Sequence, residues 1–389
     1  MPELTAQDTL DIIYRPKKLD DLIGQDHIVA VLKGMFSTRK VDRAIMLHGE
    51  SGSGKTTCAR LIARYANCTC ENFLDGNCIT CQCEHIGDHP DIVELNAANA
   101  TGIDNIRELI SQAQYMPQTN FRIFILDEAQ QISTAGKESL LTEMEEAKNS
   151  GEAVLWIICT TEPQKFKDTF LGRCTKLQIK PVEPMVLAKR LLKVAKLEKS
   201  PIALDKKSLI NIASLVRGQP RDGLKALGKV IHYLNGDSGN KKVDLELINR
   251  VVRDIVGAPS EVLLSKYLLS IYSGALDKAF TYLNSAENTE YFLKSLIEYH
   301  MNVLYSQINE TLVVQYPPFV RLNAVVKKKN FNVSTTVMSN ILVDMTKTYS
   351  DVKNYAVDAK LLANAMTCRI VGLIPTKTES DYKSQLKIL

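Results

Sequence analysis

The chain has 389 residues, which predicts about two or three domains, and 45% of its residues are hydrophobic, so each domain can bury a core. A net charge of only +4 excludes a protein that attracts nucleic acid through its overall field, so any DNA contact would come from a local surface. The sequence starts without the basic and apolar segments of a secretory signal, and its longest apolar run, residues 153–159, is too short to span a bilayer. We therefore expect a soluble protein that has no contact with a membrane.

The first 43 residues predict a lead-in segment followed by an amphipathic helix that ends near Phe36. Taken alone, Arg15 has the character of a solvated surface charge. An arm that precedes the first core strand can also fold over an adenine base. We therefore expect Arg15 to contact a nucleotide, together with the apolar side chains of Leu22 and Ile23.

Residues 44–57 combine a short apolar run, a glycine-rich loop and the start of a helix, and they match the P-loop pattern G-x-x-x-x-G-K-[ST]. Such a loop turns successive backbone N–H groups toward phosphates, and its glycines allow a close approach that a Cβ would block. We expect Lys55 to reach the β- and γ-phosphates and the Thr56 hydroxyl to hold Mg²⁺. The alternative is a glycine-rich turn before an ordinary helix. The predicted nucleotide-binding residues are Gly49, Ser51, Gly52, Ser53, Gly54, Lys55, Thr56 and Thr57.

Five of the nine cysteines fall within residues 68–83, directly after the predicted P-loop helix. Cys78-x-x-Cys81 has the spacing of a zinc knuckle, and a site made only of thiolates is typical of structural rather than catalytic zinc. The alternative is a set of free, reduced thiols. We predict that zinc is bound by Cys68, Cys78, Cys81 and Cys83, with Cys70 able to replace Cys68 or Cys83.

Two adjacent carboxylates, Asp127 and Glu128, end a predicted buried strand over residues 121–128. A strand at residues 89–95 and a helix at residues 103–115 precede it. In α/β sheets, ligands bind at the carboxyl ends of the strands. We therefore expect Asp127 to help hold Mg²⁺, and Glu128 to orient the attacking water or accept its proton. An apolar run that ends in Asp-Glu is a weak signal alone, but its position roughly 70 residues after a P-loop strengthens it.

A helix at residues 134–147, a strand at residues 154–159, and a turn with a last strand within residues 170–179 complete the predicted sheet domain. A hydroxyl at the end of the first of these strands, from Thr160 or Thr161, could sense the γ-phosphate or position water. A threonine-rich turn is the simpler explanation of the local sequence. Arg173 lies just before the last strand, where we expect it to be exposed.

Prolines at positions 181 and 184 mark a domain boundary, beyond which the periodicity is helical. Pro220 suits the first turn of a helix and places Arg221 at its start. The predicted helices before the next turn span residues 185–199, 204–217 and 219–235. The predicted domains are an α/β core with a parallel sheet at residues 1–181, including the cysteine insert at 68–83, a helical lid at 182–240, and an all-α domain at 241–389.

Together these motifs resemble the gamma/tau subunit of the bacterial DNA polymerase III clamp loader, which belongs to the AAA+ ATPases. The resemblance is close over residues 10–235 and rests beyond them on helical character and length. Its most specific parts are Tyr14-Arg15-Pro16, Ile23-Gly24-Gln25, the P-loop, the cysteine insert, residues 94–107, Leu126-Asp127-Glu128-Ala129, residues 160–165, Gly172-Arg173-Cys174 and Gly218-Gln219-Pro220-Arg221-Asp222.

The resemblance implies further roles. Thr160 or Thr161 would be sensor 1, and we favour Thr161 as the catalytic one. Arg173 would be an arginine finger that reaches the γ-phosphate bound by a neighbouring subunit, which makes hydrolysis depend on assembly. Arg221 would be sensor 2 and contact the nucleotide of its own subunit. Residues 241–389 would form the collar of a ring, expected to be pentameric, built from like or unlike clamp-loader subunits.

Three positions depart from the family pattern. Gly172 stands where serine is usual, Glu145-Glu146-Ala147-Lys148-Asn149 replaces the usual Glu-Glu-Pro-Pro, and Gln130 stands where histidine is common. Such divergence suggests a distant relative, and a phage origin is one source of it. The implied location is the bacterial cytoplasm and nucleoid, or the host cytoplasm for a phage protein.

We predict an ATP hydrolase that drives clamp loading. ATP binding would open a sliding clamp and grip primer-template DNA through its backbone phosphates, and hydrolysis would release both. The implied cofactors are ATP, Mg²⁺ and Zn²⁺. Two alternatives stay open: a nucleotide-binding scaffold subunit of the same complex, and another AAA+ DNA motor such as a branch-migration helicase subunit.

Overall fold

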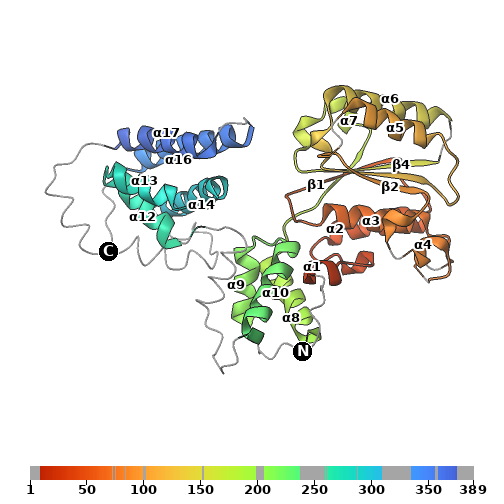
Figure 1. Cartoon of the computed structure of the whole chain (residues 1–389), viewed down its shortest axis with the longest axis horizontal. Helices are drawn as coiled ribbons and strands as arrows, with labels where there is room; N and C mark the ends of the chain where they lie inside the picture. The colour runs from red at the N-terminus through yellow and green to blue at the C-terminus, as the bar shows by residue number, and fades with distance from the viewer. Residues whose placement is uncertain are drawn as a thin grey trace, which may run out of the picture. The chain divides into compact units, whose positions relative to one another are not determined.

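The computed structural model forms two compact units, Met1–Ser238 and Gly239–Leu389. Figure 1 shows the elements of both. The predicted boundary between lid and collar at residue 240 lies outside the described residues. The described residues are 9–71, 73–74, 76–83, 85–99, 102–150, 153–198, 206–236, 259, 261–286, 288–308, 334–354 and 358–374.

A five-stranded parallel sheet with the strand order β2-β3-β4-β1-β5 is the centre of the first unit. Strands of such a sheet are covered on both faces, which is why they are near-continuous apolar runs in the sequence. All seven residues of β4 are buried. The strands are β1 (Ala44–His48), β2 (Ile92–Asn96), β3 (Arg122–Asp127), β4 (Val154–Thr160) and β5 (Thr175–Gln178).

Helices cover both faces of the sheet (Figure 1). Alternate residues of a strand belong to the cores on the two faces. Ile45 and Leu47 of β1 pack in one core with α2 (Asp26–Ser37) and α3 (Lys55–Asn67). Ala44 and Met46 pack in the other core with α5 (Ile103–Ala113), α6 (Thr134–Ser150) and α7 (Asp168–Leu171). The two layers fix where the strands end, and thereby the edge at which the carboxyl-terminal loops meet.

Short helical segments were not predicted from the sequence, because they contain too few residues to show a period. They are α1 (Leu10–Ile13), η1 (Leu19–Asp21), α4 (Ile79–Gln82), η2 (Ile86–Asp88), η3 (Ala129–Gln131), α7 and η4 (Pro163–Lys165). The strand predicted from His89 begins at Ile92 instead. No helix in the described part of the chain has both the length and the apolar character needed to cross a bilayer.

The predicted lid consists of α8 (Pro184–Leu197), α9 (Lys206–Leu215) and α10 (Pro220–Gly236). It is joined to the sheet domain at Gly218, whose carbonyl accepts the N–H of Val182 at 2.9 Å. A Cβ on Gly218 would lie 2.1 Å from Val182 O, and its φ of +71° is left-handed. Glycine is therefore required where the α9–α10 turn crosses the segment leaving the sheet.

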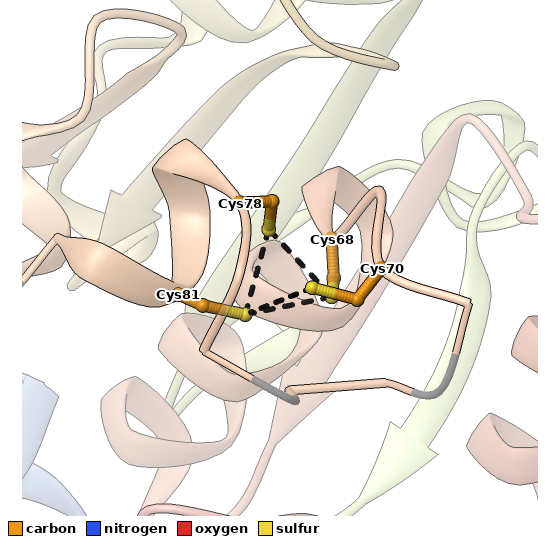
Figure 2. Close-up of side chains that lie close together, drawn as sticks. All are labelled: Cys68, Cys70, Cys78 and Cys81. Atoms are coloured by element: carbon orange, nitrogen blue, oxygen red, sulfur yellow. Dashed lines mark hydrogen bonds between the residues drawn. The ribbon is translucent and has the colours of Figure 1, made fainter.

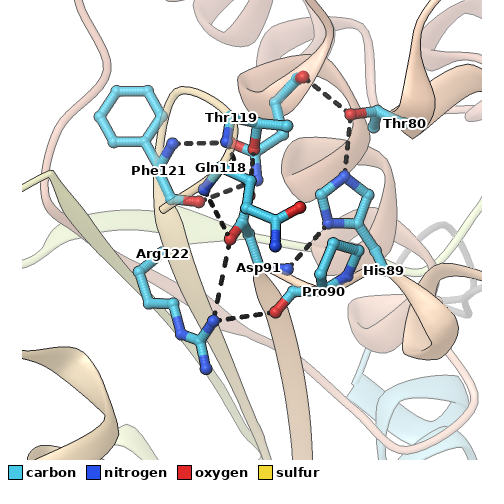
Figure 3. Close-up of polar contacts among 9 residues, drawn as sticks. Thr80, His89, Pro90, Asp91, Gln118, Thr119, Phe121 and Arg122 are labelled. Atoms are coloured by element: carbon cyan, nitrogen blue, oxygen red, sulfur yellow. Dashed lines mark hydrogen bonds and ion pairs between the residues drawn. The ribbon is translucent and has the colours of Figure 1, made fainter. Parts of the chain in front are cut away.

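Figure 3 shows the buried polar contacts that tie the cysteine insert to the sheet domain. Thr80 Oγ1 donates to Asn67 O at 2.8 Å and lies 3.0 Å from His89 Nε2, so Nε2 carries the ring proton. The other nitrogen, His89 Nδ1, accepts the N–H of Asp91 at 3.1 Å. The carboxylate of Asp91 accepts both the N–H and the hydroxyl of Thr119, just before β3. The insert is therefore bonded to the core through fully partnered buried groups.

The described residues of the second unit form helices around one cluster of buried apolar side chains. Two large members of this cluster, Tyr267 and Phe292, have rings that meet edge to face at 5.3 Å. The described helices are α12 (Glu261–Tyr272), α13 (Leu276–Asn284), α14 (Thr289–Ile308), α16 (Thr335–Asn354) and α17 (Ala359–Gly372).

His300 makes the helical unit sensitive to acid. It is fully buried on α14, its Nε2 donates to Met338 O at 2.9 Å, and Tyr272 Oη lies 3.2 Å from Nδ1. Burial lowers the pKa of His300 from 6.5 to about 4. The unfolded chain therefore takes up a proton near pH 6.5 while the folded unit does so only near pH 4. The free energy of unfolding should be constant above pH 6.5 and fall by about 1.4 kcal/mol per pH unit below it.

Hydrogen exchange of peptides from α14 and α16, corrected for intrinsic exchange rates, measures this loss between pH 7 and pH 4.5. The variant His300→Gln should remove most of the pH dependence from these helices. Equal slopes in the variant and the wild type would show that another group is responsible.

Candidate functional site

A cavity of about 450 Å³ lies at the carboxyl ends of β1 and β3. This is the edge at which parallel α/β sheets bind ligands. Residues from four separate sequence regions line it: the amino-terminal arm, the P-loop and α3, the ends of β2 and β3, and the lid. The predicted site residues among them are Arg15, Ser51, Gly52, Ser53, Gly54, Lys55, Thr56, Thr57, Asp127, Glu128 and Arg221.

The P-loop between β1 and α3 has the backbone that its glycines predict. Gly54 has a φ of +106° at the amino end of α3, and a Cβ on Gly49 would lie 2.3 Å from Ile179 O. Lys55 is 5% exposed, and its ammonium donates to the carbonyls of Gly49 and Glu50, each at 3.0 Å. Burial lowers the pKa of Lys55, and the nearby carboxylate of Glu128 opposes that shift. The loop thus holds a cation at the start of a helix, an arrangement suited to phosphate.

Thr56 and Asp127 are brought together from α3 and the end of β3. Thr56 Oγ1 donates to Asp127 Oδ2 at 2.7 Å. A hydroxyl beside a carboxylate is an oxygen donor pair of the kind Mg²⁺ accepts. These two residues therefore fit the predicted magnesium site.

Buried Ser53 Oγ has no hydrogen-bond partner among the described residues. A buried polar atom without a partner is costly in a protein interior, so it indicates a site that a ligand completes. Its place within the P-loop fits a nucleotide phosphate.

Glu128 follows Asp127 in the left-handed conformation, with φ 51° and ψ 38°. Few residues other than glycine adopt this conformation, and such strain clusters at functional sites. Its N–H donates to Asp127 Oδ1 at 3.0 Å, and its carboxylate accepts a hydrogen bond from Gln130 Nε2. Glu128 lines the cavity together with Lys55 and Asp127.

The arm and the lid supply cations to the opposite side of the cavity. Arg15 is half-buried, and burial lowers its pKa, as does the neighbouring charge of Arg60. Arg221 Nε lies 3.5 Å from the buried carboxylate of Asp11. Both arginines line the cavity, and their contact with a nucleotide stays a prediction.

Sequence reasoning missed the ion pair between Arg60 and Glu94. Arg60 Nε and Nη2 donate to the two oxygens of Glu94 at 2.8 and 2.7 Å, which joins α3 to β2 beside the cavity. The partial exposure of both side chains limits what this pair adds to stability. Only the position of Arg60 on the P-loop helix and of Glu94 near a strand end could have indicated it.

Arg173 is exposed, as predicted, and lies outside the cavity that holds the P-loop. It precedes β5, whose first residue pairs with Ile45 near the start of β1, whereas the P-loop follows the end of β1. Arg173 therefore lies near the amino ends of the strands, whereas the P-loop lies at their carboxyl ends. The guanidinium pairs with Glu145 and donates to Thr169 O at 2.9 Å, and it borders an open cavity of about 810 Å³.

Neither Thr160 nor Thr161 lines the nucleotide cavity. Thr160 is fully buried; its hydroxyl donates to Gln130 Oε1 at 2.9 Å and accepts the N–H of Glu162 at 3.0 Å. Thr161 donates its N–H to the same oxygen at 3.3 Å. The sensor role of either threonine stays a prediction.

Four cysteine sulfurs converge in the insert, as Figure 2 shows, and one of them differs from our first choice. The cluster is formed by Cys68, Cys70, Cys78 and Cys81, whose sulfurs all lie within 4.8 Å of one another. Cys83 is excluded because it follows α4 and its thiol donates to His85 O at 2.9 Å. Cys70, the alternative that the sequence left open, takes its place.

The spacing of the sulfurs fits a tetrahedral metal site. Four sulfur pairs are separated by 3.4 to 3.9 Å. A tetrahedron with Zn–S bonds of about 2.3 Å has edges of about 3.8 Å. Cys68 Sγ also accepts the N–H of Leu74 at 3.3 Å, a bond that favours thiolate. The cluster is thus compatible with structural zinc.

Comparisons with known proteins identify relatives in DNA replication. The profile of the DNA polymerase III delta subunit family matches residues 24–183. The gamma/tau subunit of DNA polymerase III from Mycoplasma genitalium is 32% identical over 297 residues, which cover 75% of this chain and 48% of the relative. The tau subunit from Bacillus subtilis is 28% identical over 300 residues, which cover 75% of this chain and 51% of the relative. The chain spans about half the length of the curated relatives it matches.

Among solved structures, the RuvB Holliday junction branch migration motor of Thermotoga maritima matches 79% of this chain and 91% of its own, with a TM-score of 0.50 and 17% identity. At that identity the likeness concerns the fold alone. The comparisons confirm the predicted resemblance to gamma/tau subunits and the predicted α/β fold with a parallel sheet.

The close approach at Gly49 gives a stability test of the P-loop geometry. Gly49→Ala should lower the free energy of unfolding by several kcal/mol, on the order of 3, because its Cβ would overlap Ile179 O. The matched control is Gly34→Ala on the exposed side of α2, where a Cβ meets nothing within 4 Å. That change should stabilise by up to about 1 kcal/mol through helix propensity. Urea unfolding followed by the fluorescence of Trp156 measures both, and similar values for the two variants would contradict the geometry.

Proposed function

We propose that this relative of the DNA polymerase III gamma and tau subunits is the ATP-hydrolysing subunit of a sliding-clamp loader. The observation that carries the proposal is the cavity that joins the P-loop to Asp127 and Glu128 at the carboxyl ends of the strands. Arg173 lies outside this cavity, near the amino ends of the strands. The carboxyl ends of the strands would supply a nucleotide site, and the opposite ends would supply the Arg173 cation to a neighbouring subunit. Such a chain completes its site only in an assembly.

Each side chain of the cavity has a distinct role in this reaction. Lys55 would neutralise charge on the β- and γ-phosphates, and backbone N–H groups of the P-loop would orient them. Thr56 and Asp127 would hold Mg²⁺, which when bound offsets the charge that develops on the phosphates. Glu128 would hold the attacking water and take its proton.

The arm and the lid would report nucleotide binding to the rest of the subunit. Arg15 and Arg221 approach the cavity from opposite ends of the first unit's sequence. The arm already contacts α10, because Arg221 lies 3.5 Å from Asp11. An anion between Arg15 and Arg221 would add a shared partner to this contact. That added partner would connect ATP binding to clamp opening and to the grip on primer-template DNA.

The proposal of a motor over a scaffold subunit rests on the carboxylates. Nucleotide binding alone requires the P-loop, whereas Glu128 in a strained backbone conformation has no purpose in a scaffold. The likeness to a branch migration motor concerns the fold alone, so it does not favour that second function.

The test is ATPase activity of the full chain with its partner subunits, measured with and without sliding clamp and primed DNA. Activity should rise when both are added, and Glu128→Gln should reduce single-turnover hydrolysis at least 100-fold while ATP binding persists, because it removes the base. Wild-type protein that binds ATP without turnover would support the scaffold role. Strand unwinding in place of clamp loading would support the helicase.

The same assay tests whether Arg173 acts in trans. Arg173→Ala and Lys55→Ala should each lose at least about 100-fold in ATPase rate. Mixing the two variants should restore part of the activity, because an interface between the intact P-loop of one and the intact arginine of the other is complete. Arg107→Ala, at an exposed arginine whose ion-pair partner in the described part of the chain is Asp104, is the control and should retain full activity. Failure of the mixture to exceed its components would contradict a role in trans.

We also propose that the cluster of Cys68, Cys70, Cys78 and Cys81 binds one zinc ion as a structural site. Zinc measured by mass spectrometry of the purified chain should be near one equivalent. Cys70→Ser should reduce it strongly, and Cys83→Ser should leave it unchanged, because the Cys83 thiol bonds to His85 O instead. Loss of zinc in Cys83→Ser with retention in Cys70→Ser would restore the original assignment.

A further inference from the structure

Gln130 is a buried amide that no part of the proposed reaction has used. It lies in η3 after β3, and 7% of its surface is exposed. Its Oε1 accepts the hydroxyl of Thr160 at 2.9 Å and the N–H of Thr161 at 3.3 Å. Because both neighbours donate to Oε1, the amide has one orientation, and its Nε2 donates to the carboxylate of Glu128. The amide therefore links the end of β4 to Glu128.

The side chains of the two threonines do not reach the cavity. Thr160 is fully buried, its hydroxyl is used in both directions, and neither threonine lines the cavity, whereas Glu128 does. The Thr160 carbonyl accepts the N–H of Gly49 in the P-loop at 3.3 Å, but the side-chain link from the β4 end to Glu128 runs through the amide.

Gln130 is itself held in place from its backbone. Lys137 Nζ donates to Gln130 O at 3.2 Å and lies 4.8 Å from the centre of the Phe166 ring. Phe166 follows η4, the segment that comes after the β4 end. The backbone of Gln130 is thus held by Lys137, and its amide is held by Thr160 and Thr161. These contacts limit how far the amide can move with Glu128.

We propose that Gln130 is a positioning residue that holds the Glu128 carboxylate for reaction and transmits the position of the β4 end to it. The inference rests on the proposed ATPase function. A carboxylate that receives one N–H keeps one oxygen oriented and the other available for water. An amide suits this place because it offers a donor to Glu128 and an acceptor to Thr160 at once. An apolar side chain of equal length offers neither.

The first experiment measures steady-state ATPase of the full chain with its partner subunits. Gln130→Met should lower kcat on the order of 10-fold, since it removes the bond that orients Glu128, while KM for ATP changes less than about twofold. The matched control is Gln131→Met, at the exposed neighbouring glutamine, which should retain wild-type kcat. Thermal unfolding of all variants shows whether each is folded.

A double-mutant cycle separates positioning from a general structural role. If Gln130 acts through Glu128, then Gln130→Met should change single-turnover hydrolysis by less than about twofold in the background of Glu128→Gln. A purely structural role would give the same 10-fold loss in both backgrounds.

The pH profile of Gln130→Glu provides a second, independent readout. A protonated carboxyl at this position offers one donor and one acceptor, as the amide does, but an ionised one repels Glu128 and offers no donor. A glutamic acid ordinarily has a pKa of about 4.3, and the adjacent Glu128 carboxylate raises it. The ratio of the variant's kcat to that of the wild type should therefore fall on the order of 10-fold from about pH 5 to about pH 8.5. The ratio for Gln131→Glu should stay flat.

Several outcomes would overturn the proposal: wild-type kcat in Gln130→Met, equal losses in both backgrounds of the cycle, or a flat ratio for Gln130→Glu. Absence of turnover in the wild-type assembly would instead contradict the ATPase function itself, and the role of Gln130 would fall with it. The wild-type measurement therefore distinguishes the two failures.

Discussion

The contact between Thr56 and Asp127 depends on the order of strands in the sheet. Asp127 ends β3 and Thr56 follows β1, and β4 lies between these two strands. The residues meet at 2.7 Å only because α3 starts above the carboxyl edge and because all the strands run in the same direction. A parallel sheet needs helical crossovers, and these bury both of its faces. The cavity is therefore a consequence of the topology, and the P-loop sequence gives it chemistry.

The same topology separates Arg173 from the cavity of its own chain. Because β5 runs parallel to β1, the residue that precedes β5 lies at the amino edge and the loop that follows β1 lies at the carboxyl edge. Arg173 is held there by Glu145 and by Thr169 O, which fixes its position without burying it. In the proposed assembly, the phosphate bound to a neighbour's P-loop would compete with Glu145 for the guanidinium of Arg173. Exchange of one ion pair for a charge-assisted bond to phosphate would make assembly and nucleotide binding favour one another.

Local sequence patterns predicted those parts of the site that depend on neighbours along the chain. The P-loop and the Asp127-Glu128 pair line one cavity, because each follows a strand that its own apolar run indicates and the strands of a parallel sheet end on the same side. The choice between Cys70 and Cys83 could not be made in this way. The spacing of Cys83 is compatible with a ligand, but the short α4 turns its thiol toward His85. The Arg60–Glu94 pair joins elements far apart in the sequence, and no local period indicates it.

Gln130 shows why a departure from a family pattern can be read only in three dimensions. In the sequence it is a glutamine where histidine is common, with no indication of a partner. In the structure it contacts the ends of two strands that adjoin in the sheet, and its amide orientation follows from the two donors on one side. A neutral imidazole also has one donor and one acceptor, so both residues can bridge a hydroxyl and a carboxylate. They differ in that an imidazole can take up a proton near neutral pH, whereas an amide cannot. The charge state of the bridging side chain therefore does not change with pH when this residue is glutamine. A histidine here could take up a proton, and the glutamine cannot.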